Sequence, residues 1–86
     1  MTFVWTPRFE KAYQALSPEM QEAVDSHLQR LEQNWRHPSL KTKKLGGKKS
    51  IWYLRISQDL RLTFEPRRQE IFLRNVGPHD ATLRSP

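Results

Sequence analysis

The sequence predicts an α+β fold in which a helical hairpin is followed by a mostly antiparallel sheet, all within one domain of residues 1–86. Up to about residue 35, apolar residues recur every three or four positions, which is the period of a helix. After Pro38 they alternate with polar residues, which is the period of a half-buried strand. A chain of 86 residues is also too short for two independent hydrophobic cores.

Two N-terminal helices are each introduced by a hydroxyl residue and a proline, Thr6-Pro7 and Ser17-Pro18. The hydroxyl can cap the free amides of a helix, and proline suits its first position. We therefore expect one helix over residues 7–16 and a second over about 18–35. The second has a single apolar stripe, formed by Met20, Val24, Leu28, Leu31 and Trp35. Almost no loop separates the two helices, so they form a hairpin whose apolar faces belong to the core.

The next segment, residues 36–50, contains no acidic residue and is rich in basic ones: Arg36, His37, Lys41, Lys43, Lys44, Lys48 and Lys49. Two interpretations stay open and are compatible. Lysines keep an exposed strand edge from pairing with other chains, and they also contact the phosphates of a nucleic acid. The pair Gly46-Gly47 is too short for a nucleotide-binding loop and predicts a turn.

Three strands follow, each with one apolar face that can cover the helices. The three faces consist of Trp52, Leu54 and Ile56, then Leu60, Leu62 and Phe64, then Ile71 and Leu73. These faces coincide if Ile56 opposes Leu60 across a three-residue loop and Phe64 opposes Ile71 across Glu65–Glu70. The pairing of every other residue in the two hairpins then follows.

This register places three arginines in one row, on the sheet face turned away from the helices. Arg55 lies opposite Arg61, and Arg61 lies opposite Arg74, while the adjacent row contains Tyr53, Thr63 and Phe72. Like charges directly opposite each other in a sheet are unfavourable, so an anion is expected between them.

Guanidinium groups match the oxygens of a phosphate, and the rings of Tyr53 and Phe72 offer faces on which single-stranded bases can stack. These two aromatic residues and Arg74 are therefore candidate contacts for a nucleic acid. The alternative is that the arginines lie over the sheet and pair with Glu65, Glu70 or an acidic partner protein.

Past the third strand the chain contains Gly77-Pro78, which predicts a sharp turn. Such a turn would bring His79 back to the end of the arginine row, where an imidazole can accept or relay a proton near neutral pH. The alternative is that His79 is structural, which is the interpretation that we give to His27 and His37.

The composition excludes several classes of protein. The chain has no cysteine, so it has no disulfide, no thiolate nucleophile and no Cys-type zinc site. Neither the histidines nor the carboxylates are spaced as metal ligands, so we expect no metal and no cofactor. No apolar run approaches the roughly 18 residues of a membrane span and no leader is evident, which favours a cytoplasmic protein without membrane contact.

The charge distribution points to a polyanionic partner. Residues 1–35 hold three Lys or Arg against five Asp or Glu, whereas residues 36–86 hold twelve against four. Nucleic acid is the first candidate for such a basic half, and a merely solubilising surface is the alternative. Without a metal, RNA is the nucleic acid that can be cleaved, because its 2′-hydroxyl attacks the adjacent phosphate when a base, an acid and cations assist.

The order and spacing of several short motifs resemble the RelE/ParE superfamily, the toxins of bacterial toxin-antitoxin pairs. The resemblance covers nearly the whole chain and rests mainly on Arg36-His37-Pro38-Ser39-Leu40, Lys43-Lys44-Leu45, Ile51-Trp52, Asp59-Leu60-Arg61-Leu62 and Leu73-Arg74-Asn75-Val76-Gly77-Pro78-His79-Asp80. It implies two N-terminal helices packed on a mostly antiparallel four-stranded sheet, with residues 2–5 as the first strand.

The resemblance also implies a function. A RelE-like toxin enters the decoding site of the ribosome and cleaves messenger RNA without a metal until its cognate antitoxin masks it, and it reaches operator DNA only through that antitoxin. Arg61 matches the arginine that stabilises the cleaved phosphate, and His79 matches a late histidine used for proton transfer. Our hypothesis adds Arg55 and Arg74 as supporting cations. RNA or ribosomal RNA would be contacted by Lys43 and Lys44, and the neighbouring Lys48 and Lys49 extend that basic surface.

Two departures from the pattern leave other functions open. Asn75 stands where a second arginine is often found, and no aromatic residue follows in a C-terminal helix. One alternative is a ParE-like toxin that inhibits DNA gyrase without hydrolysis. Another is an inactive relic that only binds its antitoxin.

Overall fold

In a computed structural model, which describes residues 1–47 and 50–86, five strands and three α-helices follow one another along the chain. The N-terminal part comprises β1 (Thr2–Trp5), α1 (Pro7–Gln14), α2 (Pro18–Gln33) and a short 3₁₀ helix, η1 (Pro38–Leu40). The C-terminal part comprises β2 (Lys43–Lys44), β3 (Trp52–Arg55), β4 (Leu60–Arg67), β5 (Glu70–Pro78) and α3 (His79–Arg84).

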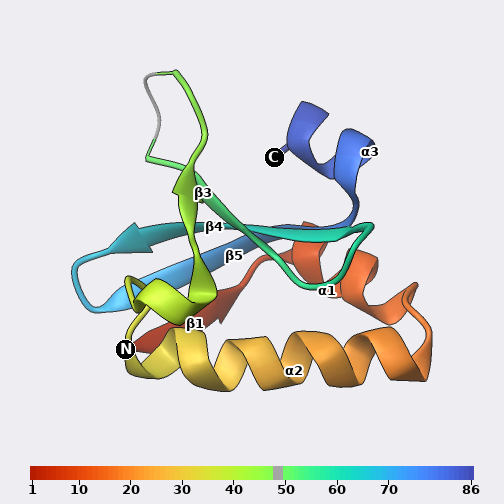
Figure 1. Cartoon of the computed structure of the whole chain (residues 1–86), viewed down its shortest axis with the longest axis horizontal. Helices are drawn as coiled ribbons and strands as arrows, with labels where there is room; N and C mark the ends of the chain where they lie inside the picture. The colour runs from red at the N-terminus through yellow and green to blue at the C-terminus, as the bar shows by residue number, and fades with distance from the viewer. Residues whose placement is uncertain (48–49) are drawn as a thin grey trace.

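The strands form one sheet in the order β1-β5-β4-β3-β2, in which β1 runs parallel to β5 and the other neighbours are antiparallel (Figure 1). The predicted α+β class is therefore confirmed, as is a strand at residues 2–5. The predicted number of four strands is one too few, because Lys43 and Lys44 pair with Tyr53 and Trp52 as β2. A strand of two residues is too short to show an alternating pattern.

Both predicted helix starts are confirmed. Thr6 Oγ1 accepts a hydrogen bond from the Phe9 amide at 3.2 Å, and Ser17 Oγ accepts one from the Met20 amide at 3.3 Å. Both helices end two residues earlier than predicted, and Asn34 after α2 is already extended. Trp35 therefore lies beyond the helix, where its ring packs edge-on against Trp52 with the ring centroids 4.9 Å apart.

The main core lies between the sheet and the helical hairpin. Its fully buried residues come from α1, α2, β3, β4 and β5, and include Phe9, Leu31, Phe64, Ile71 and Leu73. Figure 1 shows α1 and α2 on one side of the sheet and α3 on the other. We call these two sides of the sheet the hairpin face and the α3 face.

The predicted register of the first strand pair is confirmed, since Arg55 lies opposite Arg61 and Trp52 opposite Phe64. Both arginines alternate with core residues and therefore belong to the α3 face. The register of the second pair was predicted wrongly. Arg61 lies opposite Gly77 rather than Arg74.

Two features of β4 and β5 cause this difference. The ladder continues to Arg67 opposite Glu70, so a tight turn at residues 68–69 replaces the predicted six-residue loop, and Arg68 has a left-handed φ of 37° in it. In addition, β5 has a bulge: Phe64 pairs with Leu73 and Thr63 with Asn75, which leaves Arg74 as the extra residue. Three arginines therefore do not form one row.

The predicted turn at Gly77-Pro78 was also wrong, because these residues are the last two of β5 and α3 begins directly afterwards. The helix folds back over the sheet at Gly77, where a Cβ atom would lie 3.0 Å from Thr82 Oγ1. A side chain at residue 77 would therefore crowd α3, the helix that begins with His79.

Candidate functional site

Arg61 and His79 line the same open pocket, which has a volume of about 640 Å³. Its other lining residues are Gln58, Asp59, Pro78 and Asp80, from the β3–β4 loop and the junction of β5 and α3. The His79 amide donates to the Asp59 carbonyl at 2.8 Å and so ties the start of α3 to that loop. We call this the Arg61–His79 pocket.

The guanidinium of Arg61 is held in one orientation by the loop beside it. Its Nη1 atom donates to the carbonyls of Ser57 at 2.8 Å, Gln58 at 3.1 Å and Leu60 at 3.3 Å. None of the ion pairs found among the described residues involves Arg61. Its positive charge is therefore positioned by neutral acceptors and not neutralised by a carboxylate, which suits it to bind an anion.

His79 is paired with the residue that follows it. Its Nδ1 lies 2.8 Å from Asp80 Oδ1, and 51% of the histidine side chain is exposed. An ionised carboxylate can only accept, so Nδ1 carries the proton in this contact and Nε2 of the neutral ring is left as the acceptor. Asp80 was not singled out from the sequence, although its position next to His79 is the signal that could have identified it.

Arg55 and Tyr53 share the α3 face with this pocket. Arg55 is exposed directly opposite Arg61, so two arginines face each other on neighbouring strands. Tyr53 is half-buried in the next row, between Lys43 on β2 and Thr63 on β4. The α3 face thus offers two cations, Arg55 and Lys43, and one aromatic ring, Tyr53.

Arg74 and Phe72 lie elsewhere than the sequence predicts. Arg74 Nη1 pairs with Glu65 Oε1 at 3.2 Å, and Glu65 also pairs with Arg67 Nε at 2.7 Å. Phe72 lies opposite Glu65 rather than Thr63, and the Arg67 guanidinium covers its ring at 4.3 Å from the centroid. For Arg74 the alternative of an internal carboxylate partner is therefore correct, and the ring face of Phe72 is already occupied.

Two of the four candidate lysines, Lys43 and Lys44, lie among the described residues. Lys43 pairs with Tyr53 and Lys44 with Trp52, so the two exposed lysines of β2 project to opposite faces of the sheet. Lys48 and Lys49 lie outside the described residues. The predicted roles of all these residues in binding or catalysis stay predictions.

The described residues contain no group of three or more His, Asp and Glu side chains that could hold a metal ion. None of the helices in residues 1–47 and 50–86 has the length and apolar character needed to cross a bilayer.

Searches against family profiles and against curated proteins give no match. Solved structures do match: a YoeB/ParE toxin from Agrobacterium tumefaciens has a TM-score of 0.78 at 20% identity, covering 92% of this chain and 99% of that one. The E. coli RelBE toxin-antitoxin complex has a TM-score of 0.76 at 18% identity, covering 92% and 96%. YafQ from E. coli strain BL21(DE3) has a TM-score of 0.78 at 13% identity, covering 93% and 94%.

These likenesses define the class of fold. The chain has the fold shared by the RelE, YoeB and YafQ toxins, as its sequence motifs imply.

Proposed function

We propose that this protein is the toxin of a toxin-antitoxin pair and that it cleaves messenger RNA on the ribosome without a metal ion. The observation that carries the proposal is the Arg61–His79 pocket, in which a fixed arginine and a histidine with a free Nε2 line one open cavity. A toxin fold surrounds this pocket, and Arg55 and Tyr53 lie on the same face.

The geometry suits cleavage by the RNA's own 2′-hydroxyl. His79 Nε2 takes the proton of that hydroxyl, and the 2′-oxygen forms a bond to the adjacent phosphorus while the bond from phosphorus to the 5′-oxygen breaks. The leaving oxygen takes a proton from the solvent to which the pocket is open. Asp80 stabilises the imidazolium that forms, and the guanidinium groups of Arg61 and Arg55 stabilise the extra negative charge on the phosphate.

The proposal includes the partners and place of action. We infer a cognate antitoxin that covers the cationic α3 face, contact with operator DNA only through that antitoxin, and action on ribosomes in the cytoplasm. The crystallised E. coli RelBE complex is an example of a toxin of this fold bound to its antitoxin.

Mapping RNA ends in a translating extract, with and without the protein, tests the proposal. We expect new 5′ ends within translated message, and a 2′,3′-cyclic phosphate on the upstream fragment, since the 2′-oxygen is the nucleophile. His79→Ala should slow cleavage by about 10²- to 10⁴-fold, and Arg61→Ala by about 10²- to 10³-fold. Arg30→Ala is the matched control, because Arg30 is an exposed arginine of α2, which covers the hairpin face.

Two results contradict the proposal. Cleavage by the His79 and Arg61 variants at the parent rate refutes the assigned roles. Intact message together with inhibited supercoiling by DNA gyrase identifies a ParE-like inhibitor instead, and intact message with harmless expression in cells identifies a relic.

A further inference from the structure

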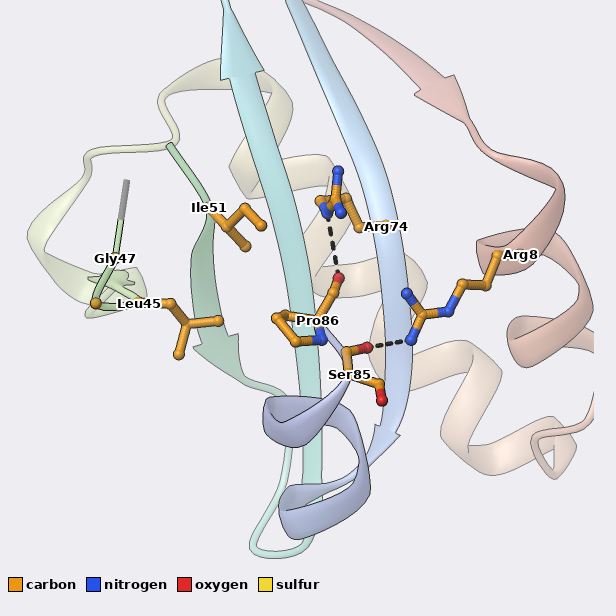
Figure 2. Close-up of a pocket in the computed structure, with 8 residues that line it drawn as sticks. Arg8, Leu45, Gly47, Ile51, Arg74, Ser85 and Pro86 are labelled. Carbon is orange, nitrogen blue, oxygen red and sulfur yellow. Dashed lines mark hydrogen bonds between the residues drawn. The ribbon is translucent and has the colours of Figure 1, made fainter. Parts of the chain in front are cut away.

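A second pocket on the α3 face, with a volume of about 530 Å³, is partly filled by the chain's own last described residues (Figure 2). It is lined by Arg8 and Arg74, by Leu45, Gly46, Gly47 and Ile51, and by Ser85 and Pro86. We propose that this pocket binds a phosphate of the RNA strand next to the one being cut, and that Ser85–Pro86 occupy its donors in the free protein. The proposal deepens the function proposed above and rests on it.

Four side chains converge on two consecutive main-chain oxygens of this segment. Arg8 Nη2 and Asn75 Nδ2 donate to the Ser85 carbonyl, the latter at 3.1 Å. Arg74 Nε and Thr63 Oγ1 donate to the Pro86 oxygen at 3.2 and 3.0 Å. The donors come from α1, β4 and β5, so the fold assembles them at one place, and Figure 2 shows both guanidinium groups turned toward the segment.

Two of these donors are guanidinium groups, which suit an anionic ligand. Arg8 pairs with no carboxylate among the described residues, and the single negative charge of Glu65 is shared between Arg74 and Arg67. Hydrogen bonds from a guanidinium to an anionic oxygen are roughly twice as strong as those between neutral groups. A phosphate at this pocket would contact both cations, whereas the Ser85 carbonyl that Arg8 meets in the free protein is neutral.

The position of Arg8 in its own helix supports this use. It lies in the first turn of α1, where the helix dipole favours an acidic side chain and disfavours a basic one. Its guanidinium instead reaches the Ser85 carbonyl, 77 residues further along the chain. This conflict with the dipole is the sequence signal that could have drawn attention to Arg8.

The two pockets are connected by α3. The helix begins with His79 at the Arg61–His79 pocket and ends at Arg84, directly before Ser85 of the second pocket, and its six residues span about 9 Å. One RNA strand lying along α3 can therefore contact both pockets. The pocket also has two apolar side chains, Leu45 and Ile51, which offer a surface for the sugar or base of the same nucleotide.

The test is binding of a short single-stranded RNA whose 2′-hydroxyls are methylated, so that it cannot be cleaved. Binding is measured by fluorescence anisotropy at fixed low salt for three proteins: the parent, a chain ending at Arg84, and the same shortened chain with Arg8→Gln. We expect the shortened chain to bind about tenfold tighter and Arg8→Gln to reverse that gain. Arg30→Gln in the shortened chain is the matched control and should leave the gain intact.

A second measurement uses the whole chain and does not depend on the shortened one. A fluorophore that responds to its surroundings is attached to Ser85→Cys, and addition of the same RNA should change its emission as the segment is displaced. Thermal unfolding of every variant is recorded beside the binding data, so that loss of the fold is recognised.

The proposal is overturned if removal of Ser85–Pro86 leaves RNA affinity unchanged or lowers it in a folded protein, or if RNA leaves the fluorophore unchanged. It is also overturned if a glutamate-rich peptide, and not RNA, gains affinity, because the ligand is then an acidic partner segment. Since the RNA is uncleavable, binding that follows the prediction while message stays intact in the extract refutes the proposed function alone.

Discussion

Replacement of Gly77 by alanine tests the link between the sheet and α3 that positions His79. The new Cβ would lie 3.0 Å from Thr82 Oγ1, and Thr82 is 2% exposed and β-branched, so it has little freedom to move. Overpacking of this kind costs about 1–3 kcal/mol. A glycine-to-alanine change in an extended strand returns about 0.4–1 kcal/mol by restricting the unfolded chain. The net expectation is a loss of about 1 kcal/mol in the free energy of unfolding.

The effect of Gly77→Ala on the free energy of unfolding should change sign when Thr82 Oγ1 is absent. In a Thr82→Ala background the Cβ of residue 77 meets no Oγ1, so only the gain of about 0.5 kcal/mol remains. Urea unfolding of the parent, both single variants and the double variant gives the coupling energy, which we expect to be about 1–2 kcal/mol. For a domain of this size, a loss of about 1 kcal/mol lowers Tm by roughly 4–8 °C.

Two results would contradict these expectations, one for the stability of the fold and one for the position of His79. Additive effects of the two substitutions would show that Gly77 and Thr82 do not restrict each other, and α3 would then not be seated as described. If Gly77→Ala destabilises the fold yet leaves message cleavage at the parent rate under conditions where it remains folded, the position of His79 is not set by this contact.

Two further predictions concern Tyr13 and Arg55. Tyr13 donates to Asp25 Oδ1 at 2.7 Å, and this hydrogen bond, followed by burial and the carboxylate charge, raises the pKa of Tyr13 above its usual value of 10.0. A raised folded-state pKa gives stability that is present below pH 10 and is lost above it, because the unfolded chain ionises first. Tyr13→Phe should therefore flatten the decline of Tm at alkaline pH. An unchanged decline would contradict this. Arg55→Ala removes a like charge opposite Arg61, so it should raise the urea midpoint while slowing message cleavage about tenfold, and a lowered midpoint would contradict the repulsion.

Sequence patterns predict the first strand pair well because its residues alternate without interruption. Residues 52–56 and 60–64 each have one apolar face, and only one register across a short loop brings both faces together. The opposition of Arg55 and Arg61 follows from that register and is found in the structure. The N-terminal helices are equally predictable, since their caps are local hydrogen bonds formed within four residues.

The second strand pair escapes prediction for two physical reasons. Pro66 makes residues 65–70 look like a loop in the sequence. Beyond Phe64, however, the strand β4 pairs with β5 alone. Proline is tolerated there because one side of the strand is unpaired. The bulge at Arg74 has no local signature, because an extra residue in one strand is defined only by its pairing with the neighbouring strand. The helix α3 directly follows a proline and has only six residues, so it is too short to show a helical period in the sequence.

The shifted register of β4 and β5 has a consequence for function. In the predicted row, Arg74 would lie beside Arg61 and the three guanidinium groups would compete for one phosphate. The tight turn and the extra residue together leave Gly77 opposite Arg61, which admits α3, and place Arg74 at the far end of that helix, where it meets the Pro86 oxygen. The cations are thereby divided between two pockets joined by α3. A divided arrangement suits successive phosphates of one strand, whereas a single cluster would hold only one.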